Sequence, residues 1–385
     1  MSRGLTIGQF VELAEKLYDP EGDNISILLL GPPGVGKTVG IKTLGQRLAE
    51  KMGRTFLDLS ETNINVKEIA EKIDQYFIFV GFSVTHVEPT DVSGFPRVID
   101  GQYASYLPLE YVYLLSLPNA AGIVFLDEIT LDNRPDRRSA ELKILDERQF
   151  GFKVLSPKVW IIAAGNTDEH TKLAEPIPDP ILRGRVMRFY IKAPTVNEWI
   201  EYMNARYGDK WEKKIAAFLR RYPGAIWVEY EDDAGYDPRL SPRTWTRLAT
   251  TLYKLGDAEP EEIEAVVASL VSGKEYNLLM TFLTTAIPPL EDLLKNPLIW
   301  PELSIEAKYI IVAEMSNIAV EELVEKFSEL LEVMAENDRE FLELLKILIP
   351  KTRRAEFLKL VKLRLPRVFK AFVAISDKAR ELFGD

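Results

Sequence analysis

The chain has 385 residues, of which 46% are apolar and 28% charged, and these values are ordinary for a globular protein of two or three domains. It has no cysteine and two histidines, which excludes disulfides and thiolate metal sites and disfavours a zinc centre. The formal charge of -11 argues against a broad surface that coats nucleic acid. No apolar run approaches the ~20 residues of a membrane span, and the N-terminus lacks the apolar core of a signal peptide, so we expect a cytoplasmic protein.

The first half of the chain alternates short apolar runs with helical patterns. Thr6 and Gln9 have the spacing of a capping box and predict a helix that begins at residue 7. The alternation that follows predicts an α/β fold, an αβα core with a parallel sheet covered on both faces. The strands are expected at 25–30, 55–60, within 76–87, and at 122–128, 158–166 and 186–192.

The pattern changes near Pro194, after which we find no convincing strand. Thr195 and Glu198 form a second capping box, which predicts a helix at this boundary. A cluster of prolines from 288 to 301 marks another boundary. We therefore expect a nucleotide-binding core over 1–192, a helical lid over 193–290 and a helical C-terminal extension over 291–385.

The extension carries two segments of opposite charge. Residues 320–334 predict one amphipathic helix with an acidic exposed side. Residues 351–370 contain eight basic residues and one acidic residue. We expect the basic segment to pair with the acidic helix, and contact with nucleic acid or an acidic partner is the alternative.

The segment GPPGVGKT follows the strand expected at 25–30 and matches the phosphate-binding pattern G-x-x-x-x-G-K-[ST] at every fixed position. Its glycines let the backbone approach a triphosphate, and the helix that follows adds its positive end. Its lysine would reach the β- and γ-phosphates of ATP, and its threonine hydroxyl would bind Mg²⁺. An ordinary glycine-rich turn is the weaker alternative. The candidate nucleotide-binding residues are Gly31, Pro32, Pro33, Gly34, Val35, Gly36, Lys37 and Thr38.

Polar residues follow two later strands. Asp127 and Glu128 end the run at 122–128, and Asn166 ends the run at 158–166. Ligands bind at the carboxyl ends of parallel strands, so these side chains are expected to face the phosphate-binding loop. Asp127 would hold Mg²⁺, mostly through water, and Glu128 would polarise the attacking water. Asn166 would hydrogen-bond the γ-phosphate and that water, although Asn is also a common strand-ending residue.

The order of loop, acid pair and Asn, followed by DPILRGRV and LSPRTW, resembles that of AAA+ ATPases. A finer resemblance is to the MoxR-like branch, whose members often carry two extra hairpins. This chain has suitable segments at 87–111 and 148–158. Ser93–Arg97 is expected at the tip of the first hairpin, where Phe95 would either grip a partner in a central pore or pack on its own domain.

The resemblance also implies roles for three arginines. Arg185 falls where such rings place the arginine finger that enters the neighbouring subunit's site, and Arg183 is the alternative. Arg243 matches the lid's sensor arginine, which contacts the γ-phosphate. Each of them is read alternatively as a surface arginine.

The sequence thus predicts an ATPase that hydrolyses Mg²⁺-ATP at the subunit interfaces of a homo-oligomeric ring, expected to be a hexamer. The resemblance implies remodelling of a protein partner, which in this branch is often a protein with a von Willebrand A domain. The alternatives are a nucleic-acid motor or restriction-type subunit, which the acidic charge disfavours, and a nucleotide-switched scaffold, which has no need of Glu128. A GTPase is disfavoured, because the chain has no N-K-x-D motif.

Overall fold

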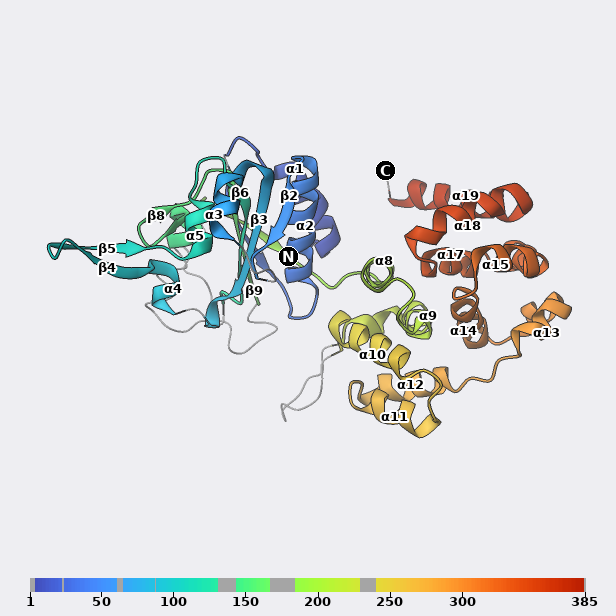
Figure 1. Ribbon diagram of the computed structural model, residues 1–385. Helices are drawn as coiled ribbons and strands as arrows, with labels where there is room; N and C mark the ends of the chain where they lie inside the picture. Colours follow the sequence, from blue (N-terminus) through green and yellow to red (C-terminus); the bar gives the residue numbers. More distant parts are fainter. Residues whose placement is uncertain are drawn as a thin grey trace. The chain divides into compact units, whose positions relative to one another are not determined.

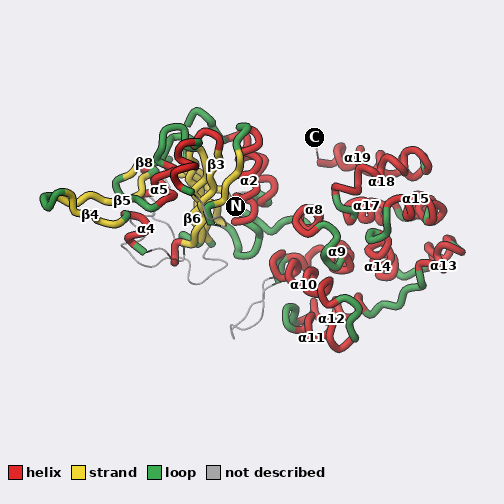
Figure 2. The backbone as a smooth tube through the Cα atoms, viewed as in Figure 1, coloured by secondary structure: helices red, strands yellow, loops and turns green. Residues whose placement is uncertain are grey.

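The chain divides into two compact units, Met1–Ala193 and Pro194–Asp385. Each unit has its own architecture, a sheet with helices in the first and helices alone in the second (Figure 1, Figure 2). The computed structural model describes residues 4–22, 24–60, 65–86, 88–130, 143–166, 184–228 and 240–383.

The first unit is built on six parallel strands in the order β10-β1-β9-β6-β3-β2. The inner strands β6 and β9 are buried along nearly their whole length, which explains why they read as continuous apolar runs. All six predicted strands are confirmed: β1 Ser26–Leu30, β2 Thr55–Asp58, β3 Tyr76–Ser83, β6 Ala121–Asp127, β9 Val159–Gly165 and β10 Val186–Tyr190.

Helices cover both faces of this sheet (Figure 1). On one face, α1 packs beside α2, and the ring of Phe10 on α1 lies 5.3 Å from that of Phe189 on β10. On the other face, Ile69 of α3 and Leu115 of α5 join a buried cluster with strand residues. The capping box predicted at Thr6 is present. The helices are α1 Ile7–Leu17, α2 Lys37–Lys51, α3 Val66–Glu71 and α5 Glu110–Leu115.

Two antiparallel hairpins project from the first unit, as the sequence predicts. The first, β4 Phe95–Ile99 with β5 Tyr103–Leu107, follows the short helix α4 Pro89–Ser93, and the second joins β7 Gln149–Phe150 to β8 Lys153–Val154. The hairpins touch each other, since the rings of Tyr106 and Phe152 lie 5.2 Å apart. A Cβ on Gly151 would lie 2.8 Å from the Ser93 carbonyl oxygen, so the backbones also approach closely.

The predicted tip of the first hairpin is wrong. Phe95 begins β4 and therefore lies at the base of the hairpin, while the turn falls at Asp100 and Gly101. Both turn residues have positive φ, 53° and 68°, and with Gln102 they form the three-residue loop between the paired residues Ile99 and Tyr103. The Asp-Gly pair at 100–101 is a stronger turn signal in the sequence than Gly94, the glycine of the predicted tip. Phe95 is nevertheless 52% exposed and is not tucked into its own domain.

The second unit is helical in its described part, where the only pairing of extended residues is an isolated bridge between Val228 and Leu240. The capping box predicted at Thr195 is present and begins the first helix. The helices are α8 Val196–Tyr207, α9 Lys213–Arg221, α10 Pro242–Leu255, α11 Pro260–Ala268, α12 Gly273–Leu283, α13 Leu290–Lys295, α14 Ile305–Met315, α15 Val320–Lys326, α16 Ser328–Asn337, α17 Arg339–Leu348, α18 Lys351–Arg364 and α19 Pro366–Phe383.

One hydrophobic core runs through this unit, from Val196 to Phe372. Helices from both sides of residue 290 pack together, since α14 contacts α9 and α17 contacts α8. The boundary predicted at 290 therefore lies within one compact unit, and the separation of lid from extension stays a prediction. The fold class predicted from the sequence, an α/β chain with an αβα core on a parallel sheet followed by a helical part, is confirmed.

An ion network around the buried Lys213 joins the basic segment to α8, to the residues between α8 and α9, and to the end of α14. The ammonium of Lys213, 0% exposed, donates to Asp209 Oδ1 at 2.7 Å and to the carbonyl oxygen of Ser316 at 3.3 Å. Arg353 donates to the same two residues. Burial lowers the pKa of Lys213, and the neighbouring Asp209 opposes that shift. Arg354 pairs with Glu201 of α8 at 2.7 Å in the same way.

Two expectations for the C-terminal half are wrong. The acidic helix predicted over 320–334 is two helices, α15 and α16, because Phe327 leaves the helical region with φ -97° and ψ 17°. In the described residues, no ion pair joins this acidic segment to the basic one, whose pairs go to Glu201 and Asp209 instead.

No described helix combines the length and the apolarity that crossing a membrane requires.

Candidate active site

The loop between β1 and α2 is shaped by glycines at three positions. Gly34 and Gly36 have φ of 84° and 93°, a region that side chains with a Cβ rarely adopt. Gly31 leaves no room for a Cβ, which would lie 2.2 Å from the Ile191 carbonyl oxygen. Gly36 caps α2 without a side-chain hydrogen bond. The loop therefore places its backbone N–H groups next to the positive N-terminal end of α2. This arrangement suits the binding of a phosphate.

Lys37 is the first residue of α2 and is only 8% exposed. Its ammonium donates to the carbonyl oxygens of Gly31 at 2.7 Å and Pro32 at 3.0 Å. It also donates to Asn166 Oδ1 at 3.4 Å, from the end of β9. These acceptors are neutral oxygens at the mouth of the loop, so a phosphate placed there would meet a positive charge that is already held in position.

Thr38 and Asp127 meet beside the loop. The Thr38 hydroxyl donates to Asp127 Oδ2 at 2.7 Å, although 89 residues separate the two positions. A hydroxyl and a carboxylate are hard oxygen donors of the kind that Mg²⁺ takes when water and phosphate supply its other ligands. The two side chains present here thus fit the predicted Mg²⁺ site. The described residues contain no group of three or more His, Cys, Asp or Glu side chains that could hold a metal ion by themselves.

Glu128 occupies an unusual backbone position. Its φ is 62°, in the left-handed region that non-glycine residues seldom adopt and that often accompanies functional sites. The conformation turns its carboxylate toward β3, where Ser83 Oγ donates to Glu128 Oε2 at 2.5 Å. Thr85 Oγ1 lies 3.4 Å from the same oxygen. The carboxylate of Glu128 is thereby fixed by two hydroxyls, while that of Asp127 accepts a bond from the backbone N–H of Glu128.

Asn166 is held from its backbone side. Its N–H donates to Thr130 Oγ1 at 2.9 Å, and Thr130 is only 3% exposed. A Cβ on Gly165 would lie 2.5 Å from Thr130, so glycine at this position lets the two segments approach. The amide of Asn166 then reaches Lys37. The structure therefore brings together five of the predicted site residues of the first unit, Lys37, Thr38, Asp127, Glu128 and Asn166.

Sequence reasoning missed Ser83, Thr85 and Thr130. Ser83 ends β3 and pairs in register with Asp127 on the neighbouring strand. The rule that strand ends meet at one edge of a parallel sheet would have found Ser83 had the end of β3 been located. Thr130 carries no comparable signal, because its role depends on a contact with a strand that begins far along the chain.

The predicted arginines lie in different places. Arg185 precedes β10 and is 57% exposed, and its guanidinium forms an ion pair with Asp146. Arg183, the alternative finger, lies outside the described residues. Arg243 is exposed in the first turn of α10, in the second unit. The functions of Arg185 and Arg243 stay predictions.

No protein-family model and no curated protein matches the chain. Among solved structures it is similar to Cdc6p from Pyrobaculum aerophilum, with 17% identity over 91% of this chain and 96% of that one and a TM-score of 0.37. It is also similar to the ORC2 protein of Aeropyrum pernix (15% identity, 96% of each chain, TM-score 0.37). A third similar structure is a RuvB mutant of Thermotoga maritima (14% identity, 84% of this chain and 85% of that one, TM-score 0.35). With TM-scores below 0.5, none of these likenesses identifies a ligand or a partner of this chain.

Proposed function

We propose that this chain is a MoxR-like AAA+ ATPase that hydrolyses Mg²⁺-ATP at the subunit interfaces of a ring and thereby remodels or assembles a protein partner. The observation that carries the proposal is the convergence of Lys37, Thr38, Asp127, Glu128 and Asn166 at one edge of the sheet. A loop that only terminates a strand has no need of an acid pair and an amide from two other strands. A scaffold that only binds nucleotide has no need of a strained, oriented Glu128.

The residues divide into binding and reacting groups. The loop N–H groups and Lys37 bind the β- and γ-phosphates. Thr38 and Asp127 hold Mg²⁺, which when bound neutralises charge on the phosphate oxygens. The bound nucleotide displaces the contacts of Lys37 with Gly31 and Pro32, because the phosphate oxygens are stronger acceptors than backbone carbonyls.

Glu128 and Asn166 act on the attacking water. The carboxylate of Glu128 accepts a proton from water as the water's oxygen attacks the γ-phosphorus in line with the leaving oxygen. The Asn166 amide orients that water and contacts the γ-phosphate. Ser83 is a positioning residue, because its hydrogen bond sets the direction of the Glu128 carboxylate. An arginine from the neighbouring subunit, Arg185 in our proposal, stabilises the negative charge on the transferred phosphoryl group.

Exposed apolar side chains on the two hairpins favour a protein as the partner. Seven of the exposed large apolar side chains of the described residues lie on these two short hairpins, and a group of exposed apolar side chains suits an interaction site. Aromatic and aliphatic groups bind other proteins, whereas phosphates require cations. A partner with a von Willebrand A domain fits this proposal. The exposed apolar residues are Phe95, Val98, Tyr103, Tyr106, Leu107, Phe152 and Val154.

A substrate trap tests the proposed function. Glu128→Gln in the presence of Mg²⁺-ATP should hold the ring on its partner, which is then recovered by affinity purification and identified. The same variant with Phe152→Ser and Val154→Ser should lose that partner while it still binds ATP. Recovery of nucleic acid in place of protein would contradict the proposal and favour a motor on nucleic acid.

A further inference from the structure

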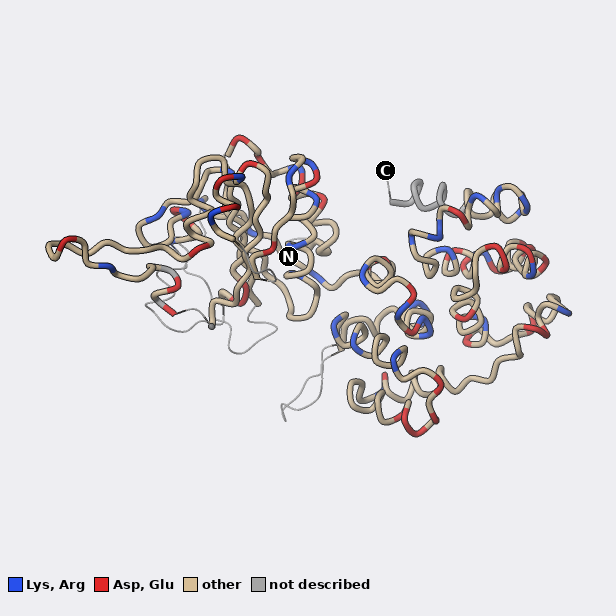
Figure 3. Tube along the Cα trace, viewed as in Figure 1, with Lys and Arg blue, Asp and Glu red and all other residues tan. Residues whose placement is uncertain are grey.

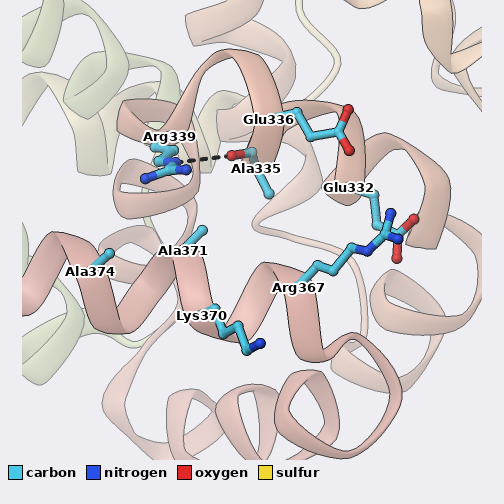
Figure 4. Close-up of a pocket in the computed structure, with 8 residues that line it drawn as sticks. All are labelled: Glu332, Ala335, Glu336, Arg339, Arg367, Lys370, Ala371 and Ala374. Carbon is cyan, nitrogen blue, oxygen red and sulfur yellow. Dashed lines mark hydrogen bonds between the residues drawn. The ribbon is translucent and has the colours of Figure 1, made fainter.

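A cavity of about 310 Å³ opens on the second unit between α16 and α19, and its walls carry opposite charges (Figure 4). Glu332 and Glu336 on α16 form the acidic wall. Arg367 and Lys370 on α19 form the basic wall. The floor contains the alanines Ala335, Ala371 and Ala374, so no long side chain of the floor fills the space.

The two walls form no direct ion pair with each other. Among the described residues, no ion pair links Glu332 or Glu336 to Arg367 or Lys370, although α16 and α19 pack together. Arg339, which also lines the cavity, donates its Nε–H to the Ala335 carbonyl oxygen at 3.1 Å. In the described residues, none of these four side chains forms an ion pair or a hydrogen bond, so each of them can pair with a second molecule.

The contrast between an acidic side and a basic side extends beyond the cavity (Figure 3). Arg353 and Arg354 at the start of α18 form ion pairs with Asp209, between α8 and α9, and with Glu201 of α8. By contrast Lys359 and Arg364, later on α18, are exposed and form no ion pair with a described residue. The carboxylates of α15 continue the acidic side, where Glu322 pairs only with Lys326 of its own helix.

We infer that this cavity is the contact surface for a second copy of the chain, related by a two-fold axis that sets each basic wall against the other copy's acidic wall. A two-fold contact is self-complementary, because residue i meets residue j and residue j meets residue i. A surface with adjacent walls of opposite charge satisfies that condition. A two-fold contact differs from the head-to-tail contacts of a ring, so in a ring it would join one ring to another.

Charge also decides between this occupant and a nucleic acid. A phosphate backbone would be drawn to Arg367 and Lys370 but repelled by Glu332 and Glu336 beside them. A second copy, in contrast, offers cations to the acidic wall and carboxylates to the basic one, which is the arrangement that gives charged interfaces their specificity.

Two charge-reversal variants of the full chain test the inference without nucleotide. Arg367→Glu with Lys370→Glu makes both walls acidic, and Glu332→Lys with Glu336→Lys makes both walls basic. Sedimentation equilibrium should show that each variant self-associates at least ~10-fold more weakly than the unaltered chain. A one-to-one mixture should recover the affinity, since an all-acidic surface faces an all-basic one. Lys210→Glu with Lys254→Glu, two exposed lysines of the lid segment, is the matched control and should change nothing.

The inference is overturned if both variants associate as the unaltered chain does, or if the mixture stays as weak as its components. It is also overturned if the all-acidic variant loses affinity for a 20-base-pair duplex while its self-association is unchanged. Glu336, Arg367 and Lys370 are exposed and Glu332 is half-buried, and circular dichroism checks that each variant folds. Should a variant misfold, Arg367→Gln with Lys370→Gln repeats the test by removing the charge. Because no nucleotide is used, failure here leaves the proposed ATPase untouched.

Discussion

The Thr38 hydroxyl donates a 2.7 Å hydrogen bond to the Asp127 carboxylate and so joins the start of α2 to the end of β6. This contact exists because β1 and β6 are parallel strands on either side of β9, so their carboxyl ends lie at the same edge of the sheet. The phosphate-binding loop and the acid pair are thereby placed within reach of one small ligand.

Removal of the loop lysine should abolish nucleotide binding. Lys37→Ala takes away a buried ammonium that is aimed at the loop, so affinity for Mg²⁺-ATP should fall at least ~100-fold, measured by fluorescence anisotropy of a labelled ATP analogue. Lys51→Ala is the matched control, because Lys51 lies at the far end of the same helix. Undiminished affinity in Lys37→Ala would remove the loop from the proposed mechanism.

Loss of the hydroxyl that holds Glu128 should slow hydrolysis without weakening binding. In Ser83→Ala the carboxylate loses its 2.5 Å hydrogen bond, so kcat should fall roughly 10-fold while KM for ATP stays within about twofold. Ser83→Thr keeps a hydroxyl and should restore much of the rate. Thr43→Ala alters a hydroxyl elsewhere on α2 that bonds only its own helix and should leave kcat unchanged. A rise in KM with kcat preserved would contradict the positioning role.

A shared site should be restored by mixing two inactive variants. Arg185→Ala removes the proposed finger, and Glu128→Gln removes the proposed base. If the two groups meet across a subunit boundary, a mixed ring contains some sites with both groups intact, and ATPase activity should reappear above either component alone. Arg185 is exposed and held by Asp146, so its loss should not disturb folding. A mixture as inactive as its components would leave the arginine without a catalytic role.

Acid should weaken the core through Asp58. Burial alone would raise the pKa of this carboxyl, but hydrogen bonds from Lys42 and Ser60 outweigh burial and lower it below its usual 3.8. The ion pair therefore stabilises the fold above pH 3.8, and that stabilisation is lost as pH falls through the lowered pKa. Urea unfolding should show Asp58→Asn to be about 1–2 kcal/mol less stable at pH 7, with the gap shrinking below pH 3.8. A gap that is equal at both pH values would contradict this account, and Asp74→Asn, at an exposed aspartate, serves as control.

The sequence predicts most of the sheet and the centre of the site for a clear reason. Buried parallel strands are short apolar runs, and the residues that follow them meet at one edge, so Lys37, Asp127 and Asn166 are found from pattern alone. Hydroxyl partners such as Ser83 and Thr130 are common residue types whose importance arises only from strand register. The φ of Glu128 likewise has no signature in the chain.

Two predictions for the C-terminal half are wrong because the local sequence pattern does not determine the structure there. The periodicity over 320–334 continues through Phe327, but the backbone breaks there and two helices result. The sequence predicts that the basic segment pairs with the nearest acidic helix. Arg353 and Arg354 instead form ion pairs with Asp209 and Glu201. The first case depends on the conformation of a single residue, and the second on ion-pair partners more than a hundred residues away in the chain. Sequence periodicity encodes neither.

The central claim is that one Mg²⁺-ATP is bound by Lys37 and Thr38 and hydrolysed through Glu128. Isothermal titration of Glu128→Gln with ATP and Mg²⁺, followed by a phosphate-release assay on the same sample, tests it most directly. We predict binding with an affinity close to that of the unaltered chain and a hydrolysis rate at least ~100-fold lower. Normal turnover in this variant, or a complete loss of binding, would contradict the claim.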